Sequence, residues 1–228
     1  MIISNSVSFI LCSLIYSILL MCIYFSRYGK EKKLVHKIFS GMSVSVFICL
    51  ILEISNYFSV LNMKTYPILN MIISKSYLVG LMTWDSLFVI YIYVISNKYE
   101  DLELGAFFKK SISKAFMVFY VIIVVLMITL PIEFSSKVGK VYSYGIVVNA
   151  AFAITEVMAA FCIFQMLKNI KQIGSKKYAP FFMFVAGGIF VMLIQSKYPQ
   201  MLLLTSLDMF ITFLTFFQIQ HIKFDKNN

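Results

Sequence analysis

Charged side chains and histidine are both scarce in this sequence. Aspartate, glutamate, lysine and arginine together make up 13% of the 228 residues, which is about half of their usual share in soluble domains. The two histidines, His36 and His221, lie at the edges of long apolar stretches, so no metal centre can be built from histidine ligands within those stretches. The motifs HExxH and GxSxG and paired acidic residues are absent as well. We therefore expect no catalytic residue, no metal site and no cofactor.

Cysteine is also infrequent and carries no redox or metal motif. None of the four cysteines is spaced as CxxC, and all lie within apolar stretches, so we expect small core residues at Cys12, Cys22, Cys49 and Cys162. The last apolar stretch lacks the lysine that a retinal-binding pump would need. Two similar halves with broken helices, the usual sequence trace of a transporter site, are missing too.

Apolar residues are what the chain has in excess. They make up 61% of the sequence, and aromatic residues make up 17%. A single globular core of this size cannot bury so large a surplus, whereas a membrane-spanning helix takes about 20 apolar residues. The sequence therefore predicts an all-α polytopic membrane protein with connecting loops, including 97–114 and 132–143. It is expected to form a single domain over residues 1–228, with seven transmembrane helices at about 6–25, 38–61, 69–96, 115–130, 144–167, 180–195 and 200–220.

Positive charge is concentrated in alternate connections between these predicted helices. Fifteen of the 20 lysine and arginine residues fall on one side of the membrane, which the positive-inside rule assigns to the cytoplasm. The N-terminus is then outside and the C-terminus cytoplasmic. The first residues carry no positive charge, so we expect an uncleaved first span and not a signal peptide. The net charge of +10 fits topology control and anionic lipid headgroups, and nucleic acid is not an expected partner.

Five ionisable residues fall inside the predicted spans: Glu53, Lys75, Asp85, Glu156 and Asp208. Each costs at least about 2.5–3.5 kcal/mol on insertion, so such a residue usually faces the bundle interior and has a partner. Lys75 lies at a depth similar to that of Glu53, and we expect these two to pair. Because four carboxylates face one lysine, we expect a polar cavity that opens outward and accepts a cation, an amine or protons.

Three further residues complete the expected ligand-binding site. Asn56 lies three residues from Glu53, and Asn149 lies seven from Glu156, so each pair shares a helix face. With Trp84, which precedes Asp85, the expected site consists of Glu53, Asn56, Lys75, Trp84, Asp85, Asn149, Glu156 and Asp208. The alternative is that these groups form interhelical hydrogen bonds, which average about 0.6 kcal/mol in membranes, and that Trp84 only packs.

The last predicted span carries a local pattern. Its features are Tyr198-Pro199, then Ser206 and Phe210, then the run FFQIQ at 216–220 and finally Asp225. Together with Tyr77, Trp84 and Tyr91 in the third span, this pattern resembles the N-terminal multi-helix membrane sensor regions of bacterial histidine kinases and diguanylate cyclases (GGDEF). The resemblance implies a bacterial cytoplasmic (inner) membrane and a signalling role of the two-component kind. The 228 residues contain no phosphoacceptor helix, ATP-binding motif or GGDEF sequence.

These patterns lead to one expected function and one alternative. We expect a membrane-embedded sensory domain that detects a ligand or a membrane condition through the polar cavity and signals through its last helix. The alternative is a small transporter, or a transporter subunit, for a cationic solute. The chain is not expected to be an enzyme by itself. The expected partners are the lipid bilayer, a cytoplasmic output domain or partner protein and, as an open option, a second copy in a homodimer.

Overall fold

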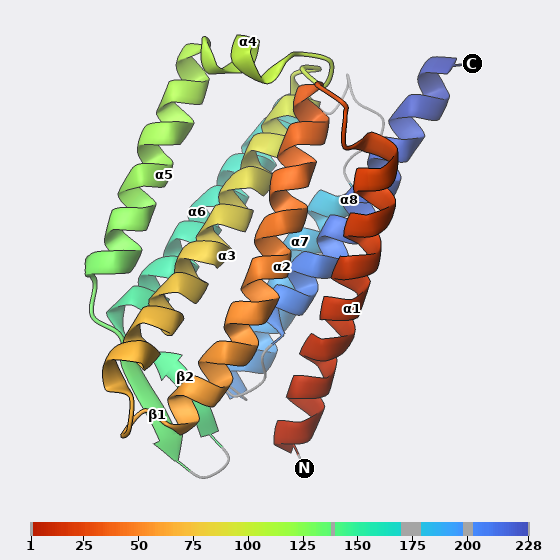
Figure 1. The fold of residues 1–228 in the computed structure, drawn as a ribbon. Helices are drawn as coiled ribbons and strands as arrows, with labels where there is room; N and C mark the ends of the chain where they lie inside the picture. Colours follow the sequence, from red (N-terminus) through yellow and green to blue (C-terminus); the bar gives the residue numbers. More distant parts are fainter. Residues whose placement is uncertain (1, 138–139, 170–178, 198–202, 228) are drawn as a thin grey trace.

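A computed structural model of the chain describes residues 2–137, 140–169, 179–197 and 203–227. Within these residues, seven long helices run side by side as a bundle (Figure 1). The elements in chain order are α1 (Ile2–Tyr28), α2 (Leu34–Leu61), α3 (Pro67–Ser96), α4 (Leu104–Phe108), α5 (Ser111–Thr129), β1 (Glu133–Lys137), β2 (Lys140–Tyr144), α6 (Ile146–Asn169), α7 (Ala179–Lys197) and α8 (Leu204–Asn227). The short helix α4 and the C-terminus lie at one end of the bundle, and the β-hairpin lies at the other (Figure 1).

The long helices overlap the predicted spans, and several of them suit a bilayer. Among the described residues, five helices are long and apolar enough to cross a membrane: Val7–Tyr28 of α1 and the whole of α2, α3, α5 and α6. A shorter apolar stretch, Ala179–Val191, lies in α7. The structure therefore confirms the helical architecture, and its several long apolar helices are those of a multi-pass membrane protein. The predicted Tyr198-Pro199 turn lies outside the described residues.

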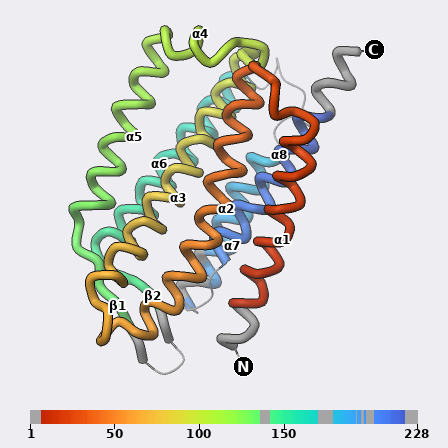
Figure 2. Tube along the Cα trace, in the orientation of Figure 1, coloured from red at the N-terminus to blue at the C-terminus, as the bar shows by residue number. Residues whose placement is uncertain are grey.

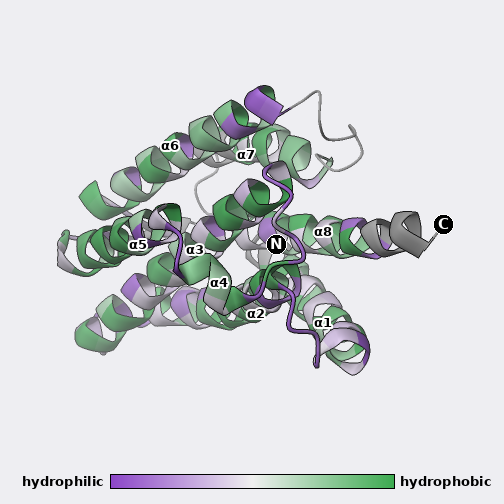
Figure 3. Ribbon diagram, turned by 90° about the horizontal axis from the view of Figure 1, so that it is seen from above, coloured by the Kyte–Doolittle hydropathy of each residue, from purple (hydrophilic) through white to green (hydrophobic). Residues whose placement is uncertain are grey.

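Apolar side chains cover the outside of the bundle as well as its interior. Figure 3, which views the molecule from above, shows apolar residues along much of each helix and hydrophilic residues in connections between helices. On α5, for example, Val118, Ile122 and Val125 are all more than half exposed. A soluble protein rarely exposes so continuous an apolar surface. Its distribution is that of helices in contact with lipid.

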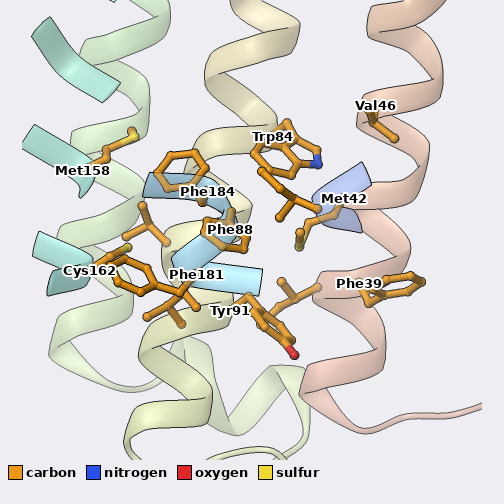
Figure 4. Packing of buried hydrophobic residues seen from close by; sticks show 14 of the residues in the cluster. Phe39, Met42, Val46, Trp84, Phe88, Tyr91, Met158, Cys162, Phe181 and Phe184 are labelled. Atoms are coloured by element: carbon orange, nitrogen blue, oxygen red, sulfur yellow. The ribbon is translucent and has the colours of Figure 1, made fainter. Parts of the chain in front are cut away.

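Helices α2 and α3 form the centre of the bundle and pack antiparallel against each other. Helix α8, although last in the chain, lies against α1, α2 and α7, while α5 and α6 lie beyond α3 (Figure 2). The core contains a stack of aromatic rings on α3, with Trp84 and Phe88 nearly parallel at 5.4 Å between ring centroids. Phe184 of α7 packs against Phe88, with 4.9 Å between the ring centroids (Figure 4).

Two connections contain structure that the prediction of plain loops missed. The predicted loop 132–143 contains the antiparallel β-hairpin, in which Glu133 pairs with Tyr144 and Lys137 pairs with Lys140. The expectation of a plain loop is therefore wrong in this segment, while the long elements of the described chain are helical as predicted. Strands of five residues are too short to stand out in a sequence beside long apolar helices. The loop 97–114 contains α4, whose single buried residue is Phe107.

Two glycines mark places where helices come close together. A Cβ atom on Gly80 of α3 would lie 2.6 Å from the sulfur of Cys49 on α2, and one on Gly187 of α7 would lie 2.6 Å from Leu207 Cδ1 on α8. Gly188 has open space instead. Small residues at such positions let membrane helices approach each other, which favours packing in the absence of a hydrophobic driving force.

Candidate functional site

Polar side chains join α2 to α3 across the bundle centre, towards the β-hairpin end. Tyr77 donates its hydroxyl proton to Glu53 Oε1 at 3.0 Å. One turn further along, the Ser74 hydroxyl donates to the Asn56 side-chain oxygen. Glu53 and Asn56 are both buried and both face α3, which confirms the prediction that they share one helix face.

A second row of hydrogen bonds joins α3 to α8 through three aromatic side chains with polar groups at seven-residue spacing. The hydroxyl oxygen of Tyr77 lies 3.0 Å from Thr205 Oγ1. Trp84 donates its indole N–H to Thr212 Oγ1 at 3.0 Å, and Tyr91 donates to Gln218 Oε1 at 2.9 Å. We call this row of six residues the aromatic ladder. The residue numbers rise together in both helices, so α3 and α8 run parallel and are held in one register.

Three carboxyl groups lie inside the bundle next to this ladder, and we call Glu53, Asp85 and Asp208 the carboxylate cluster. Their exposed fractions are 1%, 6% and 3%. Asp208 lies close enough to both Glu53 and Asp85 for the charges to interact. In the part of the chain that the structure describes, no lysine or arginine lies within 4.0 Å of any of the three. A buried charge without a partner is strongly unfavourable, so the cluster has to be neutralised by protons or by a bound cation.

Each member of the cluster has a different set of neighbours. Asp85 Oδ2 accepts a hydrogen bond of 2.7 Å from Thr155 of α6. Glu53 Oε1 accepts from Tyr77, whereas Glu53 Oε2 is buried and has no hydrogen-bond partner among the described residues. Asp208 lies on α8 between the two ladder threonines, Thr205 and Thr212. The cluster therefore joins four helices, and it has an unused acceptor oxygen.

The expected pairing of Lys75 with Glu53 is wrong. The Lys75 ammonium group donates to the backbone oxygen of Ile128, in the last turn of α5. The final carbonyl groups of a helix lack partners within the helix and carry partial negative charge, so a cation is favourable there. Similar depth in the membrane did not bring the two residues together, because Glu53 and Lys75 point to different neighbouring helices.

The expectation that Asn149 and Glu156 line the interior is also wrong, because both are exposed on α6. Their spacing of seven residues does put them on one face of α6, but that face is turned away from the bundle. Large apolar residues such as Val157 and Phe164 are also exposed on α6, so its hydropathy pattern does not reveal which side is buried. Thr155, next to Glu156 in the chain, is the α6 residue that reaches the cluster.

The remaining predicted site residues, Asp85, Asp208 and Trp84, are all buried inside the bundle. Asp208 and Asp85 are buried in the cluster as expected. Trp84 is fully buried in the core, where it packs against Phe88 (Figure 4). Its indole N–H also donates to Thr212 Oγ1. The sequence analysis missed the hydrogen-bond partners of these residues. Tyr77 connects Glu53 to α8, and the other partners are Thr155 of α6 and Thr205 and Thr212 of α8. The seven-residue spacing of Tyr77, Trp84 and Tyr91 is a signal for one shared helix face, but it does not name the facing helix.

Among the described residues, no three or more His, Cys, Asp and Glu side chains are arranged to hold a metal ion. The polar groups of the site can donate and accept protons and can attract a cation. Comparisons with protein-family models, with curated proteins and with solved structures find no match. The resemblance to bacterial sensor regions therefore stays a prediction.

Proposed function

We propose that this protein is a membrane-embedded sensory domain in which the carboxylate cluster binds a cation or protons and α8 transmits the effect. The observation that supports this most is the position of Asp208. It lies on α8 between Thr205 and Thr212, which bond the ladder residues Tyr77 and Trp84 of α3. Any change in charge at Asp208 therefore acts at the contact that holds α8 in register.

The proposed mechanism follows from the cost of buried charge. When the cluster is neutralised by protons or a cation, the three carboxyl groups are compatible with the closed packing seen here. When it is not, repulsion among carboxylates and their need for water favour a packing in which α8 is displaced from α2 and α3. Two packings that differ in their affinity for the same ligand are what a switch requires. Because the cluster is buried in this packing, entry of a ligand also requires helix displacement.

The proposed topology has seven spans, with the N-terminus outside and the C-terminus in the cytoplasm of a bacterial cell. Support comes from the distribution of basic residues. The connections at the α4 end contain Lys33, Lys98, Lys109 and Lys110, and positive charge marks the cytoplasmic side. Under this topology, α8 runs from the outer surface towards the cytoplasm. A cytoplasmic output domain or partner protein would respond to α8 there, and a homodimer is compatible with this arrangement.

A second function, transport of a cation or protons, is favoured by one observation. The described residues place three carboxyl groups inside the bundle without a lysine or arginine beside them. Buried carboxylates of this kind also occur in proton relays and ion pathways. The two functions differ in outcome, because a carrier moves solute across the membrane by itself and a sensor does not.

A ligand panel on protein in nanodiscs tests the ligand site. We expect protons or a small alkylammonium ion to raise the melting temperature of the wild type, since a ligand that binds only the folded state stabilises it by about 2.7 kcal/mol at 100 times its Kd. Asp208→Asn should lose this response. Glu156→Gln makes the same chemical change on the exposed face of α6 and should keep it. A response of equal size in wild type and in a variant with all three cluster residues converted to amides would contradict the proposal.

Two further measurements separate the sensor from the carrier. Spin labels at the exposed positions Phe217 of α8 and Met117 of α5 report on displacement of α8, after replacement of the exposed Cys12 and Cys22. A sensor should change the distance between the labels when the ligand is added, and Asp208→Asn should abolish that change. In proteoliposomes, accumulation of the same cation by the protein alone would favour the carrier and count against the sensor.

A further inference from the structure

The contact between α2 and α3 is polar in the half of the bundle next to the β-hairpin. Three pairs of side chains meet there at intervals of one helical turn: Ser59 with Asn70, Asn56 with Ser74, and Glu53 with Tyr77. In each pair a hydroxyl group donates a hydrogen bond to a side-chain oxygen on the other helix. We call these six residues the polar seam. It runs from the last turn of α2 to the carboxylate cluster.

The seam begins close to water and continues into the interior. Ser59 lies two residues before the end of α2 and is partly exposed, and Lys64 and Thr65 in the loop that follows are exposed. Further in, Asn70 and Ser74 are each only 1% exposed. Neighbouring pairs lie one turn apart, about 5–6 Å between Cβ atoms, a gap that one bridging water or a side-chain rotation spans. Hydrogen-bonding groups therefore connect the exposed loop to the cluster.

At the inner end of the seam, the hydrogen bonds point towards Glu53. Tyr77 has one hydroxyl proton and donates it to Glu53 Oε1 at 3.0 Å. The Thr205 hydroxyl, 3.0 Å from the same tyrosine oxygen, is therefore the donor in that contact. When Tyr77 passes its proton to an ionised Glu53, an O–H bond breaks at the tyrosine and one forms at the carboxyl group. A proton that arrives from the hairpin side then restores the tyrosine hydroxyl.

Glu53 has a position for the proton that it receives. Its second oxygen, Oε2, is buried and has no hydrogen-bond partner in the part of the chain that the structure describes. A half-turn of the carboxyl group moves the new O–H to this unused side and returns a free acceptor oxygen to Tyr77. The same relay can then operate again.

Towards α4, the path ends at Trp84. The indole N–H of Trp84 is a donor in the aromatic ladder, and an indole N–H cannot accept a hydrogen bond and so cannot pass a proton on. Phe88 stacks on Trp84, and Phe184 packs against both rings (Figure 4). The next polar pair of α3 and α8, Tyr91 with Gln218, lies two helical turns further along. The seam therefore connects the cluster to one side of the membrane.

The titratable groups beside the cluster are all acids. Apart from its three carboxyl groups, the side chains whose charges would interact with it are Cys49 of α2, Tyr77 of α3 and Cys162 of α6. Helices α1, α5 and α7 contain one charged residue each, and all three are exposed: Arg27, Lys114 and Lys197. The requirement for helix displacement applies to a metal ion or an amine. A proton is the exception, because it moves between hydrogen-bonding groups in the packing seen here.

We propose that the ligand of the carboxylate cluster is the proton, and that it enters from the β-hairpin end along the polar seam with Tyr77 as the last relay before Glu53. This inference rests on the function proposed above and gives that function a ligand and a direction. Under the proposed topology the hairpin end is the outer one, so the domain reports acidity outside the cell.

The test is an acid step on one side of liposomes that contain the full-length protein, followed through the infrared band of protonated carboxyl groups. The cluster's share of the band is identified by its loss when Glu53, Asp85 and Asp208 are converted to amides. An impermeant maleimide on Lys64→Cys gives the fraction of molecules with the hairpin end outward, after replacement of the exposed Cys12 and Cys22. In preparations of unequal orientation, acid added outside should protonate the cluster in this fraction only.

Two variants interrupt the path and leave the three carboxyl groups in place. Tyr77→Phe should slow proton uptake by roughly tenfold or more, because a positioned group no longer takes part in the transfer. Its control, Tyr16→Phe on the exposed side of α1, should not slow uptake. Asn56→Leu should also slow uptake, whereas Asn149→Leu, the same change on the exposed face of α6, should not. With a large acid step, the final amplitude should equal that of wild type, which separates a relay from a structural role.

The outcomes separate this proposal from the sensory function on which it rests. Protonation from the α4 side, protonation from both sides alike, or wild-type rates in both Tyr77→Phe and Asn56→Leu would overturn the proposal and leave the sensory function standing. A cluster that binds an alkylammonium ion but shows no carboxyl band in acid would do the same. Protonation along the seam without a change in the distance between the α8 and α5 spin labels would support the route and contradict the sensory function.

Discussion

Trp84 of α3 donates its indole N–H to the hydroxyl oxygen of Thr212 on α8, and both side chains are fully buried. The Thr212 hydroxyl in turn donates to the backbone oxygen of Asp208 at 2.7 Å. The two bonds connect the aromatic stack of α3 to the helical turn that carries a buried carboxyl group.

Loss of the Trp84–Thr212 bond should destabilise the protein by a small but measurable amount. Trp84→Phe keeps an aromatic ring against Phe88 but removes the donor, and Thr212→Val removes the acceptor. Hydrogen bonds between membrane helices contribute about 0.6 kcal/mol on average and about 1.7 at most. A double-mutant cycle on the free energy of unfolding should give a coupling in this range. Purely additive effects would show that the contact contributes no stability.

Loss of the Tyr77 hydroxyl should cost more, because it removes the donor to Glu53 Oε1 and the partner of the Thr205 hydroxyl. Glu53 Oε2 already has no partner among the described residues, and the cost of leaving a buried polar group unsatisfied is about 1–3 kcal/mol. We expect Tyr77→Phe to lower the free energy of unfolding by this amount. Tyr16→Phe removes a hydroxyl from a side chain that is 62% exposed, and it should have no effect. The prediction fails if both variants unfold alike.

The close approach of α2 and α3 at Gly80 should not tolerate a methyl group. A Cβ at Gly80 would lie 2.6 Å from Cys49 Sγ, and overpacking of this kind costs about 1–3 kcal/mol. That cost exceeds the gain in helix propensity from glycine to alanine, at most about 1 kcal/mol. Gly80→Ala should therefore lower the melting temperature.

Two further variants separate the clash at Gly80 from a general effect of the substitution. Gly188→Ala makes the same change on α7 where nothing lies within 4 Å, so it should not destabilise the protein. Cys49→Ala should recover part of the loss in Gly80→Ala, because it removes the sulfur that the new methyl group meets. If the double variant is as unstable as the sum of its single variants, the two residues do not share this contact.

The helices of this protein could be predicted because each one is a long apolar stretch bounded by polar residues. Length and hydropathy are local properties, and a bilayer imposes a minimum length on any helix that crosses it. The same reasoning placed Glu53 and Asn56 on one face correctly, because positions three residues apart on a helix are neighbours. The hairpin of β1 and β2 was missed, because its strands are short and polar beside the apolar helices.

The candidate site was predicted in part, since Glu53, Asp85 and Asp208 do lie together in the interior. Lys75 and Glu156 did not join them. In a soluble helix the polar face is the outer face, so hydropathy reveals the orientation. Here the outside of the bundle is as apolar as the inside, and a lone polar residue gives no sign of which way its face is turned.

The sequence by itself determined that the chain builds apolar helices with a few ionisable groups inside them, because hydropathy and residue spacing are local. Only the tertiary structure decided which groups meet. In the folded protein, Tyr77, Trp84 and Tyr91 contact α8. Lys75 donates a hydrogen bond to the C-terminal end of α5, and Glu156 is exposed on the outside of the bundle. The reason is that helices of nearly uniform hydropathy are oriented by close packing at small residues and by specific hydrogen bonds. Those contacts join residues more than 100 positions apart in the chain, such as Trp84 and Thr212.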